Sequence, residues 1–66
     1  MNIRLNGDHY PLEEGATVAA LIDALALKGR RIAVEVNEEI VPRSAHSAHR
    51  LKEGDRVEVV HAIGGG

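Results

Sequence analysis

The sequence predicts a two-layer α+β domain in which one main helix packs across one face of a mixed sheet of four to five strands. Apolar and polar residues alternate near both ends of the chain, which is the period of β-strands. Between these ends, residues 17–29 repeat their apolar residues at helical spacing. A chain of 66 residues is too short to cover both faces of a sheet, so we expect one face to stay open to partners.

The start of the chain predicts a β-hairpin. Apolar residues alternate with polar ones in "MNIRL", and Asn6-Gly7 suits the left-handed backbone of a tight turn. We expect two short strands, at about residues 2–5 and 8–12. Pro11 cannot donate a hydrogen bond to a neighbouring strand, which places the second strand at an edge of the sheet.

The next segment, "TVAALIDALALKG", predicts the main helix. Its apolar residues follow the i, i+3, i+4, i+7 spacing of one helical face. Thr17 can cap the start of the helix, and Gly29 can end it in a left-handed conformation. The residues of the apolar face are Val18, Leu21, Ile22 and Leu25.

The second half of the chain returns to the period of strands. A third strand is expected from Arg31 to about Val36, and "EIVPRS" reads as a short extended piece that Pro42 ends. Periodicity leaves "AHSAHR" open, as an irregular loop or a single helical turn. Leu51 is expected in the core, and "EGD" forms a tight turn.

The last strand is expected in "RVEVVHAI", which follows this turn. Strand alternation puts Val57 and Val59 on one face and Glu58 and Val60 on the other. If the first pair faces the helix, the second pair faces the open side of the sheet.

Composition excludes several classes of function. The chain has no cysteine, which removes disulfides, thiolate nucleophiles and cysteine-ligated zinc. Tyr10 is the one aromatic residue and the net charge is −2, which argues against nucleic acid binding. No segment resembles a signal peptide, and no apolar run approaches the ~20 residues that a membrane span needs. We therefore expect a cytoplasmic protein with no nucleic acid or membrane partner.

The chain ends in three glycines, Gly64, Gly65 and Gly66. A frayed terminus or a linker remnant would be an ordinary explanation. Glycine lacks a Cβ, however, so such a tail can thread a narrow channel and let a partner's backbone approach the terminal carboxylate. We expect a single domain over residues 1–63 and a flexible glycine tail over residues 64–66.

A terminal carboxylate is a poor acyl donor and must be activated before it reacts. The simplest activation is attack on the α-phosphate of ATP, which gives an acyl-adenylate and is assisted by Mg²⁺ and basic groups. The sequence has no phosphate-binding loop, so activation is expected on a partner that uses ATP and Mg²⁺, with no cofactor bound by this chain. The tail is then a substrate, and the chain is a protein co-substrate rather than an enzyme.

The whole chain resembles the ThiS family, the ubiquitin-like sulfur carriers of thiamine biosynthesis. The resemblance rests on "IRLNG", "TVAALI", "AVEVNEEIVPRS" and "LKEGDRVEVVHAIGGG", with the stop directly after the glycines. It implies a β-grasp fold, which agrees with the expected order of strands and helix.

The resemblance also implies a reaction cycle with three partners. A ThiF-type enzyme adenylates the C-terminal glycine, and sulfur from a persulfide donor such as a cysteine desulfurase displaces AMP to leave a thiocarboxylate. A ThiG-type thiazole synthase then takes this sulfur into the thiazole ring. Gly66 matches the glycine that carries the thiocarboxylate, and Gly65 matches the second glycine of the terminal pair. Gly64 stands where the family accepts Gly or Ala.

Apolar residues beside the tail are candidates for partner binding. Val60, Ala62 and Ile63 follow one another closely, and an adenylating enzyme could grip them before it threads the glycines. Arg43 and Arg56 could frame such a patch with charge, although we interpret them as solvated residues.

The histidines allow a second chemistry. His46 and His49 are three residues apart, which would put both rings on one side of a helical turn. A zinc site needs at least three protein ligands, and the sequence places no third one nearby, so we expect solvated histidines and no metal. His61 could assist acyl chemistry, but at the end of a strand it more often packs or contacts a partner.

Other functions remain open on the sequence. A carrier for molybdopterin or another sulfur-containing metabolite would share the fold and the tail. A ubiquitin-like protein modifier would transfer the activated Gly66 to a lysine of a target. A plain β-grasp binding module would have an idle tail, and deletion of Gly65 and Gly66 would leave its function intact.

Overall fold

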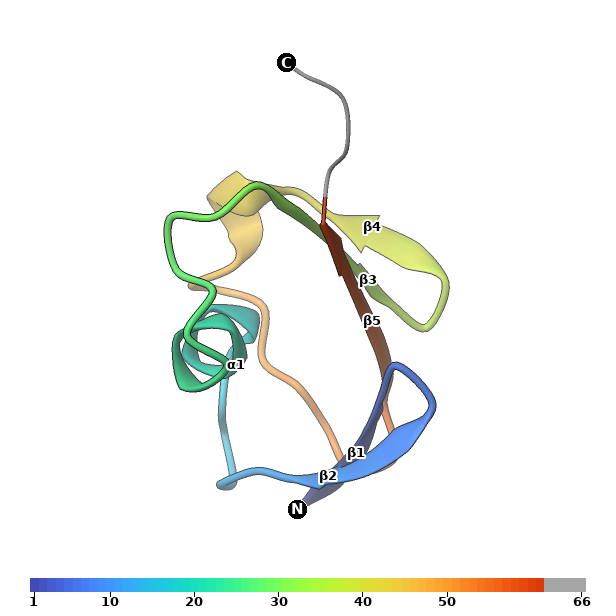
Figure 1. The fold of residues 1–66 in the computed structure, drawn as a ribbon. Coiled ribbons are helices and arrows are strands. Elements are labelled where there is room, and N and C mark those ends of the chain that lie inside the picture. Colours follow the sequence, from blue (N-terminus) through green and yellow to red (C-terminus); the bar gives the residue numbers. More distant parts are fainter. Residues whose placement is uncertain (62–66) are drawn as a thin grey trace.

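In the computed structural model, which describes residues 1–61, one α-helix packs on one face of a five-stranded mixed sheet (Figure 1). The strands lie in the order β2-β1-β5-β3-β4; β1 and β5 are parallel and the other neighbours are antiparallel. This confirms the predicted fold class. In chain order the elements are β1 (Asn2–Leu5), β2 (Asp8–Pro11), α1 (Val18–Ala24), β3 (Ile32–Val36), β4 (Glu39–Val41), the 3-10 turn η1 (Arg43–Ala45) and β5 (Arg56–His61).

The hairpin of β1 and β2 forms as predicted. Asn6 and Gly7 have φ angles of 50° and 88°, the left-handed backbone that a two-residue hairpin turn requires. The strand β2 lies at the edge of the sheet, where Pro11 has no strand beyond it to bond.

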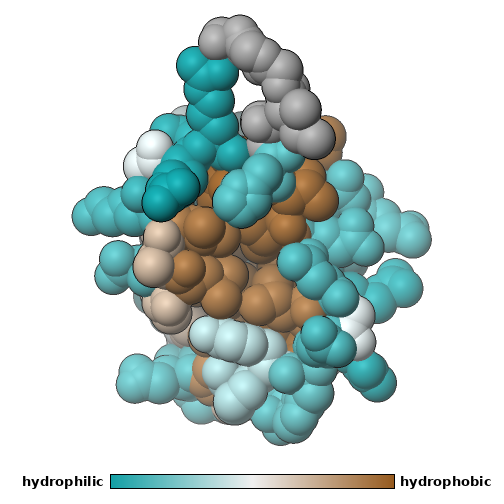
Figure 2. All heavy atoms as spheres, viewed as in Figure 1, coloured by the Kyte–Doolittle hydropathy of each residue, from teal (hydrophilic) through white to brown (hydrophobic). Residues whose placement is uncertain are grey.

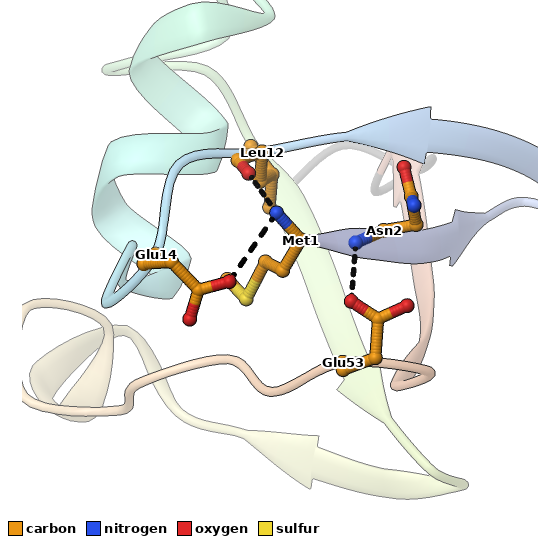
Figure 3. A network of polar contacts seen from close by, with 5 residues as sticks. All are labelled: Met1, Asn2, Leu12, Glu14 and Glu53. Atoms are coloured by element: carbon orange, nitrogen blue, oxygen red, sulfur yellow. Dashed lines mark hydrogen bonds and ion pairs between the residues drawn. The ribbon is translucent and has the colours of Figure 1, made fainter.

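The start of the chain is tied to two loops, as Figure 3 shows. The amino group of Met1 donates to the carbonyl oxygen of Leu12 at 2.7 Å and lies 3.5 Å from a carboxylate oxygen of Glu14. The backbone N–H of Asn2 donates to the side chain of Glu53 at 2.9 Å. The first strand is therefore held at its beginning as well as along its length.

The helix begins where the sequence predicted and ends earlier. The Oγ1 of Thr17 accepts a hydrogen bond from Ala20 N at 3.1 Å, which confirms the N-cap. The expected end at Gly29 is wrong, because α1 stops at Ala24 and Ala26 turns the backbone with a φ of 61°. A longer helix would point Leu27 away from the sheet, whereas the turn lets this side chain pack against the core.

The core lies between α1 and the sheet. Figure 2 shows apolar side chains gathered there, with polar side chains around them. Leu51 reaches this core from a loop and is 3% exposed, as predicted. The buried apolar residues are Ile3, Val18, Leu21, Ile22, Val34, Val36, Val41, Leu51, Val57 and Val59.

A buried carboxylate links two turns next to the first residue of β5. Asp55 is the buried charged residue of the described chain, and its carboxylate accepts hydrogen bonds from Lys52 N at 2.8 Å and Asn37 Nδ2 at 3.0 Å. Because a buried carboxylate without partners would be costly, these bonds fix the two turns relative to each other.

Within residues 1–61, no helix is long and apolar enough to span a bilayer.

Candidate functional site

The expected reactive tail lies outside the described residues. The predictions for Ala62, Ile63, Gly64, Gly65 and Gly66 therefore stay predictions, as do the domain boundary at residue 63 and the flexibility of the tail. The structure describes the base from which this tail departs. That base is the end of β5, where His61 pairs with Ile32 of β3.

The strand β5 is held from both sides. It pairs with β3 from Val57 to His61 and with β1 at Arg56 and Val57. Beyond the end of β1, the side chain of Asn6 takes over: its Oδ1 accepts from Val59 N at 2.9 Å, and its Nδ2 donates to Val59 O at 3.2 Å. The base of the tail is thus fixed by hydrogen bonds on both edges almost to the last described residue.

The side chains of β5 alternate between the two faces of the sheet, as predicted. Val57 and Val59 face α1 and are 1% and 8% exposed. Val60 faces away from the helix and is 55% exposed. Its partner in the neighbouring strand is Ala33, which is also exposed.

The sequence reasoning missed a second apolar residue on this side. Ile40 of β4 is 72% exposed and pairs with Glu35 of β3. The signal was available, because Ile40 and Val41 are consecutive apolar residues of one strand and one of them has to face outward. We call Ala33, Glu35, Ile40, Glu58 and Val60 the outer face, on the side of the sheet away from α1.

An acidic pair lies next to the apolar residues of the outer face. Glu35 and Glu58 are directly opposite each other on β3 and β5, two register positions from Ala33 and Val60 and therefore on the same face. Together with Glu38 and Arg56 they line a shallow hollow of about 210 Å³. Like charges at directly opposite positions are unfavourable for folding, so this surface is not arranged for stability alone.

The two arginines that could frame the patch lie in different places. Arg56 lines the hollow beside the acidic pair. Arg43 does not reach this side, since its Nη2 donates to the carbonyl oxygen of Arg30 at 2.9 Å and it lines a groove beside α1.

The backbone of His46 and His49 forms hydrogen bonds with the start of the helix. The carbonyl oxygens of His46 and His49 each accept a bond of 2.9 Å from the first N–H groups of α1, those of Ala19 and Val18. The Nε2 of His46 also lies 3.1 Å from the carbonyl oxygen of Val41. Both histidines are half-buried, so they are less exposed than the solvated side chains that the sequence predicts.

The segment "AHSAHR", which the sequence left open as a loop or a single helical turn, begins at the end of a 3-10 turn and continues as a hydrogen-bonded turn. Its start belongs to η1, and Arg50 forms an isolated bridge with Thr17. Among residues 1–61, no three side chains of the types that bind metals come together. His61 is exposed at the end of β5.

The sequence matches the ThiS family over residues 3–66. It is 42% identical to a thiazole synthase of Magnetococcus marinus and 39% identical to one of Paramagnetospirillum magneticum, over all 66 residues in each case. This chain spans only 20% of the length of those two relatives. It is 30% identical to the sulfur carrier protein ThiS of Escherichia coli, over the full length of both chains.

Solved structures agree with the fold. The crystal structure of the thiamine biosynthesis protein ThiS from Geobacter metallireducens superposes with a TM-score of 0.87 at 35% identity, over all of both chains. A solution structure of a thiamine biosynthesis protein from the same organism gives a TM-score of 0.79 and covers all of this chain and 88% of the other. The β-grasp arrangement expected from the sequence is therefore confirmed.

Proposed function

This chain belongs to the ThiS family, and from that premise we propose that it is a sulfur carrier for the thiazole of thiamine. The observation that carries the proposal is the end-to-end similarity to the sulfur carrier protein of Escherichia coli. The family match includes the three terminal glycines. The chain would act as a co-substrate of its partner enzymes rather than as an enzyme.

The proposed chemistry takes place on the carboxylate of Gly66. A carboxylate oxygen attacks the α-phosphorus of ATP, pyrophosphate leaves, and an acyl-adenylate forms. The outer sulfur of a partner's persulfide then attacks the acyl carbon and displaces AMP, which gives an acyl disulfide. A second thiol of the partner cleaves the S–S bond of this intermediate, so that the thiocarboxylate leaves and the two partner thiols end as a disulfide. ATP and Mg²⁺ belong to the adenylating enzyme, which stabilises the charge that develops on the phosphates.

The glycines of the tail suit this chemistry. A residue without a Cβ lets the enzyme's backbone come close on all sides, so Gly65 and Gly64 would pass through a channel too narrow for larger residues. Ala62 and Ile63 would lie at the mouth of this channel. The well-anchored end of β5 supports the proposal, because a fixed base limits the directions in which the tail can depart.

The outer face is the proposed contact for the ThiF-type adenylating enzyme. Val60 and Ile40 offer exposed apolar surface close to the base of the tail. Glu35 and Glu58 offer negative charge. An enzyme that binds ATP phosphates carries basic groups around its active site, and these attract an acidic surface during association.

Two further partners complete the proposal. One is a persulfide donor such as a cysteine desulfurase. The other is a ThiG-type thiazole synthase, and the similarity of this chain to part of two thiazole synthases supports that assignment.

Adenylation by the host's ThiF-type enzyme tests the proposal. We expect ATP–pyrophosphate exchange that depends on this chain, and no exchange with a variant that lacks Gly65 and Gly66. Circular dichroism of the truncated variant is the control, and we expect an unchanged spectrum because a terminal tail contributes little packing. Equal exchange with the full and the truncated chain would contradict a role of the tail.

A further inference from the structure

A second concave surface lies on the helix side of the molecule, away from the outer face. It is a groove of about 610 Å³ between α1, the turn after the helix and the segment that contains η1. Ile22, Leu27 and Ile32 contribute apolar surface to it. A groove of this volume has room for side chains of a partner.

The rim of the groove is basic. Lys28, Arg30 and Arg43 line it, and Asp23 is the one acidic residue among its lining residues. This is a local excess of positive charge on a chain whose net charge is −2. A surface of one sign around an apolar floor favours a partner segment of the opposite sign.

Part of this rim is held in place before any partner arrives. The Nη2 of Arg43 donates to the carbonyl oxygen of Arg30 at 2.9 Å, which links η1 to the turn that follows the helix. The Nε2 of His46 lies within hydrogen-bond distance of the carbonyl oxygen of Val41. Preorganised side chains lose less conformational entropy on binding, so such a rim suits recognition.

The groove adjoins the base of the tail. Ile32, which lines the groove, pairs with His61, the last described residue of β5. Strand alternation places His61 on the same side of the sheet as Val57 and Val59, which is the side of α1. An enzyme that holds the chain beyond His61 can therefore reach the groove without crossing the sheet.

We infer that this groove is the docking site for an acidic segment of the thiazole synthase, which places an apolar side chain against Leu27 and Ile32 and carboxylates near Lys28 and Arg30. The inference rests on the proposed function and deepens it, since it assigns different surfaces to the adenylating enzyme and to the thiazole synthase. The adenylating enzyme contacts the outer face, and the synthase contacts the groove.

Charge decides which enzyme suits which surface. The basic groups that bind ATP in the adenylating enzyme would be repelled by Lys28, Arg30 and Arg43, and they complement Glu35 and Glu58 of the outer face. The groove therefore suits a partner other than the adenylating enzyme. Association with a thiazole synthase also has support in the two relatives of that name that contain a region similar to this whole chain.

The test compares a double charge reversal in the groove with a matched reversal elsewhere. The groove variant is K28E/R30E, and the control is R50E/K52E, which makes the same change of charge at exposed residues that do not line the groove. Each full-length chain is titrated against the purified thiazole synthase of the same organism by calorimetry. Adenylation of each chain by the ThiF-type enzyme is measured in parallel.

We expect K28E/R30E to weaken binding to the synthase roughly tenfold or more, and the wild-type affinity to fall as salt is added. The control should bind like the wild type. Adenylation of K28E/R30E should stay within about twofold of wild type, because charges at the rim of one interface act on association with the enzyme that binds there. In a ¹⁵N-labelled wild-type chain, the amide signals of Leu27 and Ile32 should shift when the synthase is added.

Normal binding of K28E/R30E to the synthase, or an equal loss in the control, would overturn the inference. So would a loss of adenylation as large as the loss of synthase binding. These outcomes differ from failure of the proposed function, in which the wild-type chain itself is not adenylated.

Discussion

The two faces of β5 differ although they belong to the same six residues. On the side of α1, Val57 and Val59 are buried in a continuous apolar core. On the other side, Glu58 faces Glu35 and Val60 is 55% exposed. One face of the strand thus forms part of the core, and the other face carries the proposed contact with the adenylating enzyme.

The contrast shows which features of the outer face are not explained by stability. A cross-strand pair of like charges is unfavourable, and exposed Val60 and Ile40 gain little from the fold. An exposed apolar group next to an acidic pair is instead typical of a docking surface, with an apolar centre and charges that guide association. Folding of this chain depends on the inner face, and we expect the adenylating enzyme to depend on the outer one.

The largest effect is expected from a substitution on the inner face. Val57→Ala removes two buried methyl groups from a side chain that is 1% exposed. We expect the free energy of unfolding to fall by about 1–3 kcal/mol, from lost burial and the cavity left behind. Urea unfolding followed by circular dichroism measures this change. A loss below about 0.5 kcal/mol would mean that the inner face of β5 is not the packed core described above.

The matched substitution on the outer face is Val60→Ala. It makes the same chemical change three residues further along the same strand, so we expect the free energy of unfolding to stay within about 0.5 kcal/mol of wild type. Affinity for the adenylating enzyme should fall by about 1 kcal/mol or more, since apolar anchors at the centre of an interface dominate binding. Calorimetry with the purified enzyme measures it. Unchanged affinity would remove Val60 from the proposed contact.

The smallest effect should have the opposite sign. Glu58→Gln removes one of the two facing carboxylates, and we expect the free energy of unfolding to rise by about 0.2–1 kcal/mol at low salt. The gain should shrink as salt screens the wild-type repulsion. Thermal unfolding of both chains at two salt concentrations gives the comparison. A variant less stable than wild type would show that Glu58 has a favourable role in folding.

The sequence predicted the elements whose signals are local. The strand periods, the turn at Asn6-Gly7, the cap at Thr17 and the inward placement of Leu51 all follow from neighbouring residues, and the structure has each of them. The orientation of Val60 was also predictable, because the period of two fixes it once the inner face is known.

The features that the sequence did not predict depend on contacts between residues far apart in the chain. The end of α1 is set by the core, because Leu27 packs there only if the helix has already stopped. The pairing of Glu35 with Glu58 depends on strand order, which periodicity does not give. The half-buried state of His46 depends on the carbonyl group of Val41, and the groove is assembled from segments of both halves of the chain.

The most direct test of the account is the intact mass of the chain after incubation with the host's adenylating enzyme, Mg-ATP and a persulfide donor. The account predicts a gain that matches replacement of one oxygen by sulfur, with fragmentation that places the change on Gly66. In a parallel control, the same enzyme preparation modifies its own carrier protein. An unchanged mass of this chain beside a positive control would contradict the sulfur-carrier function.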